Sequence, residues 1–204
     1  MDIENFIAKN KSLVIVPFDK ASLDVLSSAI ATYISLINSG YSVDILYSGE
    51  VTEDIKKLAG NINIQNTTPE KHLVISVDYK DKAIEEVNYS IEDNKLNLIL
   101  KPISNNFEVG NISYNIKGGS YDTAILFGCW NKESSSLMTS NPTVFEKTKI
   151  VNIDISNNNS KMGDLNIVDD EFDSVAELTL QTLAKWGVKI PKSAAQLLLN
   201  CINS

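Results

Sequence analysis

The stretch Ile150–Glu177, IVNIDISNNNSKMGDLNIVDDEFDSVAE, decides the fold of this chain. It begins with an apolar run that is typical of a strand buried on both faces. An Asn-rich turn and a short second strand follow, and acidic residues then precede a helix, where the helix dipole favours negative charge. This order predicts a strand of a parallel sheet with a helix packed beside it.

Similar apolar runs lie on the amino-terminal side of this stretch. A helical pattern separates the first two runs: it begins at Ser22 and ends at Gly40, where a C-terminal glycine belongs. Strands that alternate with helices predict an α/β fold with a mainly parallel, Rossmann-like sheet flanked by helices. We expect a single domain over residues 1–204. The strands expected in its sheet are 13–16, 41–47, 72–78, 123–128 and 150–154.

Residues 84–116 have a different pattern. Apolar and polar residues alternate in VNYSIEDNKLNLILKP, with a turn at Glu92-Asp93-Asn94, which predicts an antiparallel β-hairpin over 84–101. The segment ISYNI (112–116) is expected to add a third antiparallel strand to this insert. Shorter helices are expected over 2–10 and 51–60, and two final helices over about 170–186 and 192–203.

The composition excludes several classes of protein. The net charge is −8 and all 18 basic residues are Lys, so the chain lacks the basic surface that long nucleic acid requires. No apolar run approaches the roughly 18 residues of a membrane span, and the amino terminus does not resemble a signal peptide. Cys129 and Cys201 form no disulfide or zinc pattern. We therefore expect a cytoplasmic protein with no membrane partner.

The opening stretch resembles the signature segment of the DHH phosphoesterase family. In that family a strand ends in Asp-His-His, and a "GD-N-VD" strand and an "S-TAE" helix follow. The resemblance extends over nearly the whole chain and is clearest at 13–34 and 122–199, as in the N-terminal domain of oligoribonuclease or bifunctional nanoRNase-like members. The matching residues of the opening stretch are Asn152, Ile153, Asp154, Gly163, Asp164, Asn166, Val168, Asp169, Ser174, Ala176 and Glu177.

The resemblance implies a two-metal site, in which carboxylates and imidazoles hold cations that activate a water and bind phosphate. Most of the implied ligand positions carry other residues here. The second Asp of the first motif is retained as Asp24, and Asp154 is retained from the third motif. The last motif places its ligand at or just beyond Ser204, at the end of the sequence. The replaced positions are Phe18 and Ser22 in the first motif, Gly128 in the second, and Ile155 and Ser156 in the third.

Two carboxylates, Asp24 and Asp154, would hold a metal weakly at most, so we expect no cofactor, with weakly bound Mn²⁺ or Mg²⁺ as the alternative. The turn that contains Asn159 and Lys161 matches the family's phosphate-proximal loop. It is either a plain Asn-rich turn or a residual anion-binding site. His72, the one histidine, begins a different strand and is interpreted as a surface residue.

The preferred hypothesis is a catalytically degenerate DHH-like domain, a pseudoenzyme that acts in ligand binding or protein interaction. The alternative is an active metal-dependent phosphoesterase on short oligonucleotides or nucleotides with replaced ligands. The expected partners are a second copy of the chain or an intact paralogue of the family. The sequence does not continue into the family's C-terminal substrate-binding domain, so we expect a natural short form or a fragment of a longer protein.

Overall fold

A computed structural model describes residues 3–53, 56–57, 60, 62–70, 72–79, 84–103, 109–117 and 119–203. The chain divides into two compact units. The first consists of residues 1–70 and 118–204, and the second of residues 71–117.

The first unit is built on a parallel sheet. Its strands are β1 (Ser12–Pro17), β2 (Ser42–Ile45), β7 (Thr123–Phe127), β8 (Lys149–Asp154) and β9 (Leu165–Val168). They lie in the order β2-β1-β7-β8-β9, and every neighbouring pair is parallel. The α/β fold predicted from the apolar runs is therefore confirmed, and β9, the short second strand of the opening stretch, forms one edge of this sheet.

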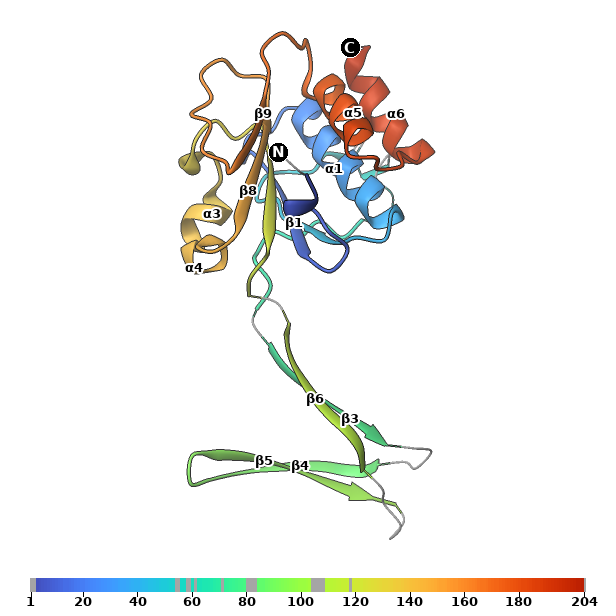
Figure 1. Cartoon of the computed structure of the whole chain (residues 1–204), viewed down its shortest axis with the longest axis vertical. Coiled ribbons are helices and arrows are strands. Elements are labelled where there is room, and N and C mark those ends of the chain that lie inside the picture. Colours follow the sequence, from blue (N-terminus) through green and yellow to red (C-terminus); the bar gives the residue numbers. More distant parts are fainter. Residues whose placement is uncertain are drawn as a thin grey trace. The chain divides into compact units, whose positions relative to one another are not determined.

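Helices cover both faces of this sheet (Figure 1). Three long helices, α1 (Leu23–Asn38), α5 (Val175–Lys185) and α6 (Lys192–Ile202), pack on one face, and α1 contacts both α5 and α6. The short helices α3 (Ser136–Ser140) and α4 (Pro142–Phe145) lie on the other face, after a single turn of 3-10 helix at Lys132–Ser134. Alternate residues of β1 enter the two cores: Leu13 and Ile15 face the long helices, whereas Val14 and Val16 face the short ones.

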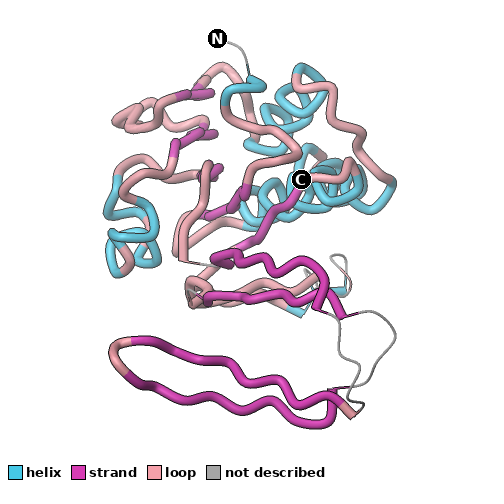
Figure 2. Tube along the Cα trace, turned by 60° about the horizontal axis from the view of Figure 1, so that its bottom comes forward, coloured by secondary structure: helices cyan, strands magenta, loops and turns pink. Residues whose placement is uncertain are grey.

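The second unit contains two antiparallel ribbons. Strand β3 (His72–Tyr79) pairs with β6 (Val109–Lys117), and β4 (Ile84–Glu92) pairs with β5 (Lys95–Pro102). Figure 2 shows β4 and β5 as two long strands joined by a tight turn. Both central residues of that turn, Asp93 and Asn94, have positive φ (49° and 60°), as hairpin turns that match the strand twist require. The predicted hairpin is confirmed.

Two expectations about these strands were wrong. Residues 72–78 are not in the parallel sheet, because β3 pairs with β6 and the two run antiparallel. The apolar residues Leu73, Ile75 and Val77 follow a period of two, which is typical of a strand with one apolar face rather than of a fully buried strand. Residues 112–116 belong to β6 and pair with β3 instead of extending the β4–β5 hairpin.

The remaining helices agree with the sequence in part. Near the amino terminus the structure has one 3-10 turn, η1 (Ile3–Asn5), where a longer helix over 2–10 was expected. The helix expected over 51–60 falls partly on residues outside those described. Among the described residues, no helix is both long and apolar enough to span a bilayer.

Candidate functional site

The carboxyl ends of β1, β7 and β8 form the edge at which ligands bind in open parallel sheets. Backbone hydrogen bonds join the three strand ends: the Phe18 N–H donates to Phe127 O at 2.9 Å, and the Gly128 N–H donates to Ile153 O at 3.0 Å. Among the implied ligand positions, Phe18 and Gly128 therefore directly follow β1 and β7, and Asp154 ends the adjacent strand β8. Ser22 and Asp24 follow β1 at the start of α1, where the exposed Ser22 caps the helix by accepting from the Val25 N–H at 3.3 Å.

Asp24 binds a helix end with both of its carboxylate oxygens. The Val175 N–H donates to Oδ2 at 2.7 Å, and the Ala176 N–H donates to Oδ1 at 2.9 Å. These amides belong to the first turn of α5, whose N–H groups lack partners within the helix. Asp24 thus acts as a charged second cap for α5, in addition to the Ser174 Oγ, which accepts from the Glu177 N–H.

Asp154 is buried at the end of β8, and its carboxylate is bound by its own surroundings. The Asn159 side-chain amide donates to Oδ2 at 2.6 Å, and the Ile155 N–H donates to Oδ1 at 2.9 Å. The same Asn159 amide nitrogen donates to Cys129 O at 3.2 Å. Its oxygen accepts from the Asn152 amide at 2.9 Å. Asn159 therefore fixes the 157–161 turn to the ends of β7 and β8.

Lys161 completes this turn in a left-handed conformation, with φ of 51°. Its N–H donates to the Asn159 side-chain oxygen at 2.8 Å. Because Asn159 is committed to these internal hydrogen bonds, the predicted anion-binding role would depend mainly on Lys161. Beside the turn, Ile155 packs against the core of the long helices, and the Ser156 Oγ accepts from the Asn158 N–H at 3.3 Å.

The two other implied ligand positions carry groups that cannot bind a metal through a side chain. The Phe18 ring contacts the Trp130 ring, with 4.6 Å between centroids. Gly128 has φ of +66°, and a Cβ placed on it would lie 3.0 Å from both Cγ atoms of Val25. A carboxylate at position 128 would therefore need a left-handed backbone and a displaced Val25.

Cys129 follows Gly128 in the chain and is fully buried. Burial, together with the nearby carboxylates of Asp154 and Asp19, raises the pKa of its thiol to about 12. The thiol is therefore protonated at neutral pH and is not poised as a nucleophile. Cys129 therefore has a packing role in the core of the short helices.

A polar cluster next to this edge has no counterpart in the sequence-predicted site. The Asp19 carboxylate accepts from the Ser48 Oγ and from the Ser136 N–H, each at 2.7 Å. Ser48 and Ser136 also line a pocket of about 290 Å³, together with Thr67, Thr68 and other polar residues. Ser48 and Ser136 are more than eighty residues apart in the sequence. No motif spacing could therefore indicate this cluster.

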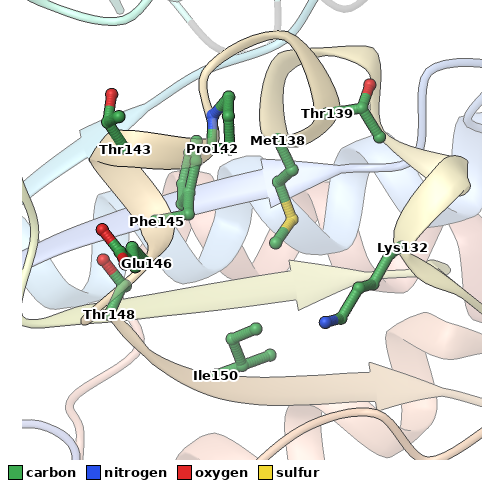
Figure 3. Close-up of a pocket in the computed structure, with 9 residues that line it drawn as sticks. All are labelled: Lys132, Met138, Thr139, Pro142, Thr143, Phe145, Glu146, Thr148 and Ile150. Atoms are coloured by element: carbon green, nitrogen blue, oxygen red, sulfur yellow. The ribbon is translucent and has the colours of Figure 1, made fainter.

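A larger pocket of about 650 Å³ lies beside α3 and α4 (Figure 3). Met138, Phe145 and Ile150 form its apolar part, and Lys132 extends its ammonium group into it. Glu146 and three threonines supply further polar groups around its rim. Sequence patterns do not indicate this pocket, because its residues come from two short helices, the turns beside them and the start of β8.

The donor set of this site does not fit a two-metal cluster. The side chains of Phe18 and Ile155 offer no ligand atom, Gly128 has no side chain, and Asp24 and Asp154 already accept internal hydrogen bonds. Among the described residues, no group of three or more His, Cys, Asp or Glu side chains could hold a metal ion. His72 begins β3 in the second unit, and Ser204, at the fourth-motif position, lies outside the described residues.

Comparison with known proteins supports the fold. No protein-family model matches this sequence, and no curated protein matches it. Among solved structures, the chain is similar to the crystal structure of an exopolyphosphatase-related protein from Bacteroides fragilis, with a TM-score of 0.61 and 12% sequence identity. The match covers 94% of this chain and 45% of that one, so the chain spans less than half of the length of that structure.

Proposed function

We propose that this chain is a catalytically degenerate phosphoesterase-like domain that acts in ligand binding or protein interaction. The structural likeness to an exopolyphosphatase-related protein supports the phosphoesterase-like fold. The signature residues of the DHH resemblance support the same relationship. At the positions where that family holds its metals, however, this chain has lost most of the ligand atoms.

The observation that carries this proposal is the position of Asp24. It is the one carboxylate retained from the first motif, and both of its oxygens accept hydrogen bonds from the amino terminus of α5. A carboxylate that two backbone amides already bind is a poor ligand for a cation, because the metal would compete with those donors. The retained acid thus has a structural task that does not require a metal.

The chemistry of the family supports the same conclusion. A metal-dependent phosphoesterase generates hydroxide at neutral pH because cations lower the pKa of bound water. Positive groups must also stabilise the charge that develops on phosphate in the transition state. This chain has no Arg to compensate for missing cations. An active phosphoesterase with replaced ligands is the alternative that the experiment below tests.

The test is hydrolysis of short oligonucleotides, cyclic dinucleotides and phosphoadenosine phosphate in the presence of Mn²⁺. We expect no turnover above the Mn²⁺-only background, and calorimetric titration should not show two stoichiometric Mn²⁺ sites of micromolar affinity. The double variant Ile155→His/Ser156→His should stay inactive, because the first and second motifs still lack their ligands.

The matched comparison uses Asp24→Ala and Asp154→Ala, with the exposed Asp173→Ala as the control. Turnover in the wild type and in Asp173→Ala that both other substitutions abolish would show a working metal site and would refute the proposal.

A further inference from the structure

The β4–β5 ribbon has one apolar and one polar face. Successive side chains on a strand point to opposite faces, and directly paired residues share a face. On one face three cross-strand pairs are entirely apolar: Val87 with Leu100, Tyr89 with Leu98, and Ile91 with Leu96. On the other face the pairs are mainly polar or charged: Glu86 with Lys101, Asn88 with Ile99, Ser90 with Asn97, and Glu92 with Lys95.

The described part of the chain leaves this apolar face open to solvent. The exposed fractions are 61% for Val87, 70% for Tyr89, 71% for Ile91, 55% for Leu96 and 45% for Leu98. A two-stranded ribbon is marginally stable in water unless its apolar face is covered. A contiguous apolar surface of this kind marks an interaction site in a folded protein.

The β3–β6 ribbon has the same construction. Ile75 pairs with Tyr114 and Val77 pairs with Ile112, so these side chains lie on one face, next to Leu73. Tyr114 is 79% exposed, Ile112 is 66% exposed and Leu73 is 58% exposed. Ser76 and Ser113 form a polar pair on the opposite face. The second unit therefore presents two ribbons with exposed apolar faces.

We propose that the apolar face of the β4–β5 ribbon binds the same face of a second copy of this chain in a two-fold dimer, and that the apolar face of β3–β6 adds to this interface. The proposal deepens the role in protein interaction suggested above and does not depend on the loss of the metal ligands. A two-fold interface brings identical surfaces together, so each surface must be complementary to itself.

The distribution of charge favours a second copy over a different partner. The six side chains on the β4–β5 apolar face include no charged group, so two identical faces can meet without repulsion, although each chain carries a net charge of −8. The charged groups of the ribbon lie elsewhere, and the Lys101 ammonium forms an ion pair with Glu85 at 3.1 Å. The apolar face offers no charge pattern that would select an acidic or a basic partner.

The available area is also sufficient. Eight strongly exposed apolar side chains on the two ribbons, each offering on the order of 60–100 Å², give roughly 500–800 Å² per copy. A standard specific interface buries about 800 Å² per partner. The ribbons thus supply most of the area that a stable dimer requires before any backbone or neighbouring atoms are counted.

The test is the molar mass of the full chain over a dilution series, measured by sedimentation and by light scattering. One chain has a mass of 22.5 kDa, so a dimer has twice that, 45 kDa. We expect the wild type at 45 kDa, with dissociation on dilution. Wild-type protein at 22.5 kDa throughout would overturn the proposal, and so would an assembly well above 45 kDa, since a two-fold contact closes on itself.

The decisive variants each replace one cross-strand pair of the β4–β5 ribbon, one on its apolar face and the other on its polar face. Tyr89→Glu/Leu98→Lys places opposite charges across the strands, which favours the hairpin but not an apolar interface. We expect at least roughly thirtyfold weaker dimerisation, as for loss of a central interface residue. Ser90→Glu/Asn97→Lys introduces the same charges on the polar face and should remain dimeric. Equal dissociation of both variants, or a dimer in both, would overturn the proposal.

A second variant addresses the possibility that charges disrupt the ribbon itself. Tyr89→Thr/Leu98→Thr retains residues that favour strands and removes apolar area, and it should also weaken the dimer. Both tryptophans, Trp130 and Trp186, lie in the first unit, so their fluorescence reports the folding of that unit alone. A dimer of unchanged affinity in the threonine variant would contradict the proposal. Sedimentation and light scattering measure mass and not hydrolysis. The dimer proposal and the proposed loss of activity can therefore fail independently of each other.

Discussion

The Asp24 carboxylate accepts a hydrogen bond from the Val175 N–H at 2.7 Å, which joins the start of α1 to the start of α5 across 151 residues of sequence. The position of Asp24 in the first-motif pattern implies a metal ligand. In the structure the same carboxylate satisfies amides at a helix amino terminus, where a negative charge is favoured. A residue type suited to a cation is therefore equally suited to a helix end, and only the partner distinguishes the two roles.

This relationship predicts the effect of Asp24→Ala on stability. The substitution removes two charge-assisted hydrogen bonds and leaves two amides of α5 without protein partners. We expect the free energy of unfolding to fall by about 2–3 kcal/mol. Chemical denaturation followed by the fluorescence of Trp130 and Trp186 measures this change. The exposed Asp173, which precedes the same helix, is the control, and Asp173→Ala should change stability by less than about 0.5 kcal/mol. Equal effects of the two substitutions would contradict the capping role.

A second prediction concerns Asn159. Asn159→Ala removes the amide that binds Asp154 at 2.6 Å and the oxygen that accepts from Asn152 and Lys161. Because it leaves a buried carboxylate with one fewer donor, we expect a loss of about 2–4 kcal/mol in the free energy of unfolding.

The neighbouring Asn158 provides the control for this change. Its side chain is exposed, and Asn158→Ala should be nearly neutral. Denaturant titration compares the two variants. A loss below 1 kcal/mol for Asn159→Ala, by the usual scale of a single hydrogen bond, would show that the network contributes little to stability.

A third prediction separates backbone strain from side-chain overlap at Gly128. Gly128 and Gly187 have nearly the same φ, +66° and +67°, but nothing lies within 4 Å of a Cβ placed on Gly187. Gly187→Ala should cost only the left-handed penalty of about 1–2 kcal/mol. Gly128→Ala should cost about 1–3 kcal/mol more, because the new methyl group overlaps Val25.

The double variant Gly128→Ala/Val25→Ala tests the source of that extra cost. It should show less destabilisation than the sum of the two single substitutions, since the shortened side chain at position 25 removes the overlap. Thermal or denaturant unfolding of the four proteins gives the coupling free energy. Strict additivity would rule out the contact between these two positions.

A fourth prediction follows from the raised pKa of the Cys129 thiol. An unfolded Cys has a pKa of about 8.5, whereas burial, with Asp154 and Asp19 nearby, raises the pKa of Cys129 to about 12 in the folded chain. The protonated thiol therefore contributes stability that is complete below about pH 8.5. This contribution is lost as the pH rises toward about 12, by up to about 1.4 kcal/mol per pH unit.

The measurement is the free energy of unfolding of the wild type and of Cys129→Ala between about pH 7 and pH 10. The pKa of Cys201 is also raised by burial, but that group is present in both proteins and its effect cancels. The difference between the two curves should shrink with rising pH above about 8.5. Parallel curves over the whole interval would show that the Cys129 thiol ionises as freely in the fold as in the unfolded chain.

The sequence alone determined the parallel core and the hairpin. The runs LVIV (13–16) and AILF (124–127) are apolar at every position, and only a strand covered on both faces buries all of them. The turn at Asp93-Asn94 is equally local, because these residue types tolerate positive φ. Phe18, Gly128 and Ile155, at positions where the resemblance implies metal ligands, were also visible in the sequence, since they depend on residue identity and not on geometry.

Only the tertiary structure decided which partners those segments and side chains have. The strand at 72–79 has a mixed pattern that suits either a buried or a one-sided strand, and its pairing with β6 selected the second. Asp24 and Asn159 have acceptors and donors that could serve a cation, an anion or the protein itself. The amides of α5 reach Asp24 by packing across 152 residues of sequence. Asp154 is only five residues from Asn159, and the fold of the turn between them sets their distance. A hydrogen bond depends on distance and direction in space, and the order of residues along the chain does not specify either.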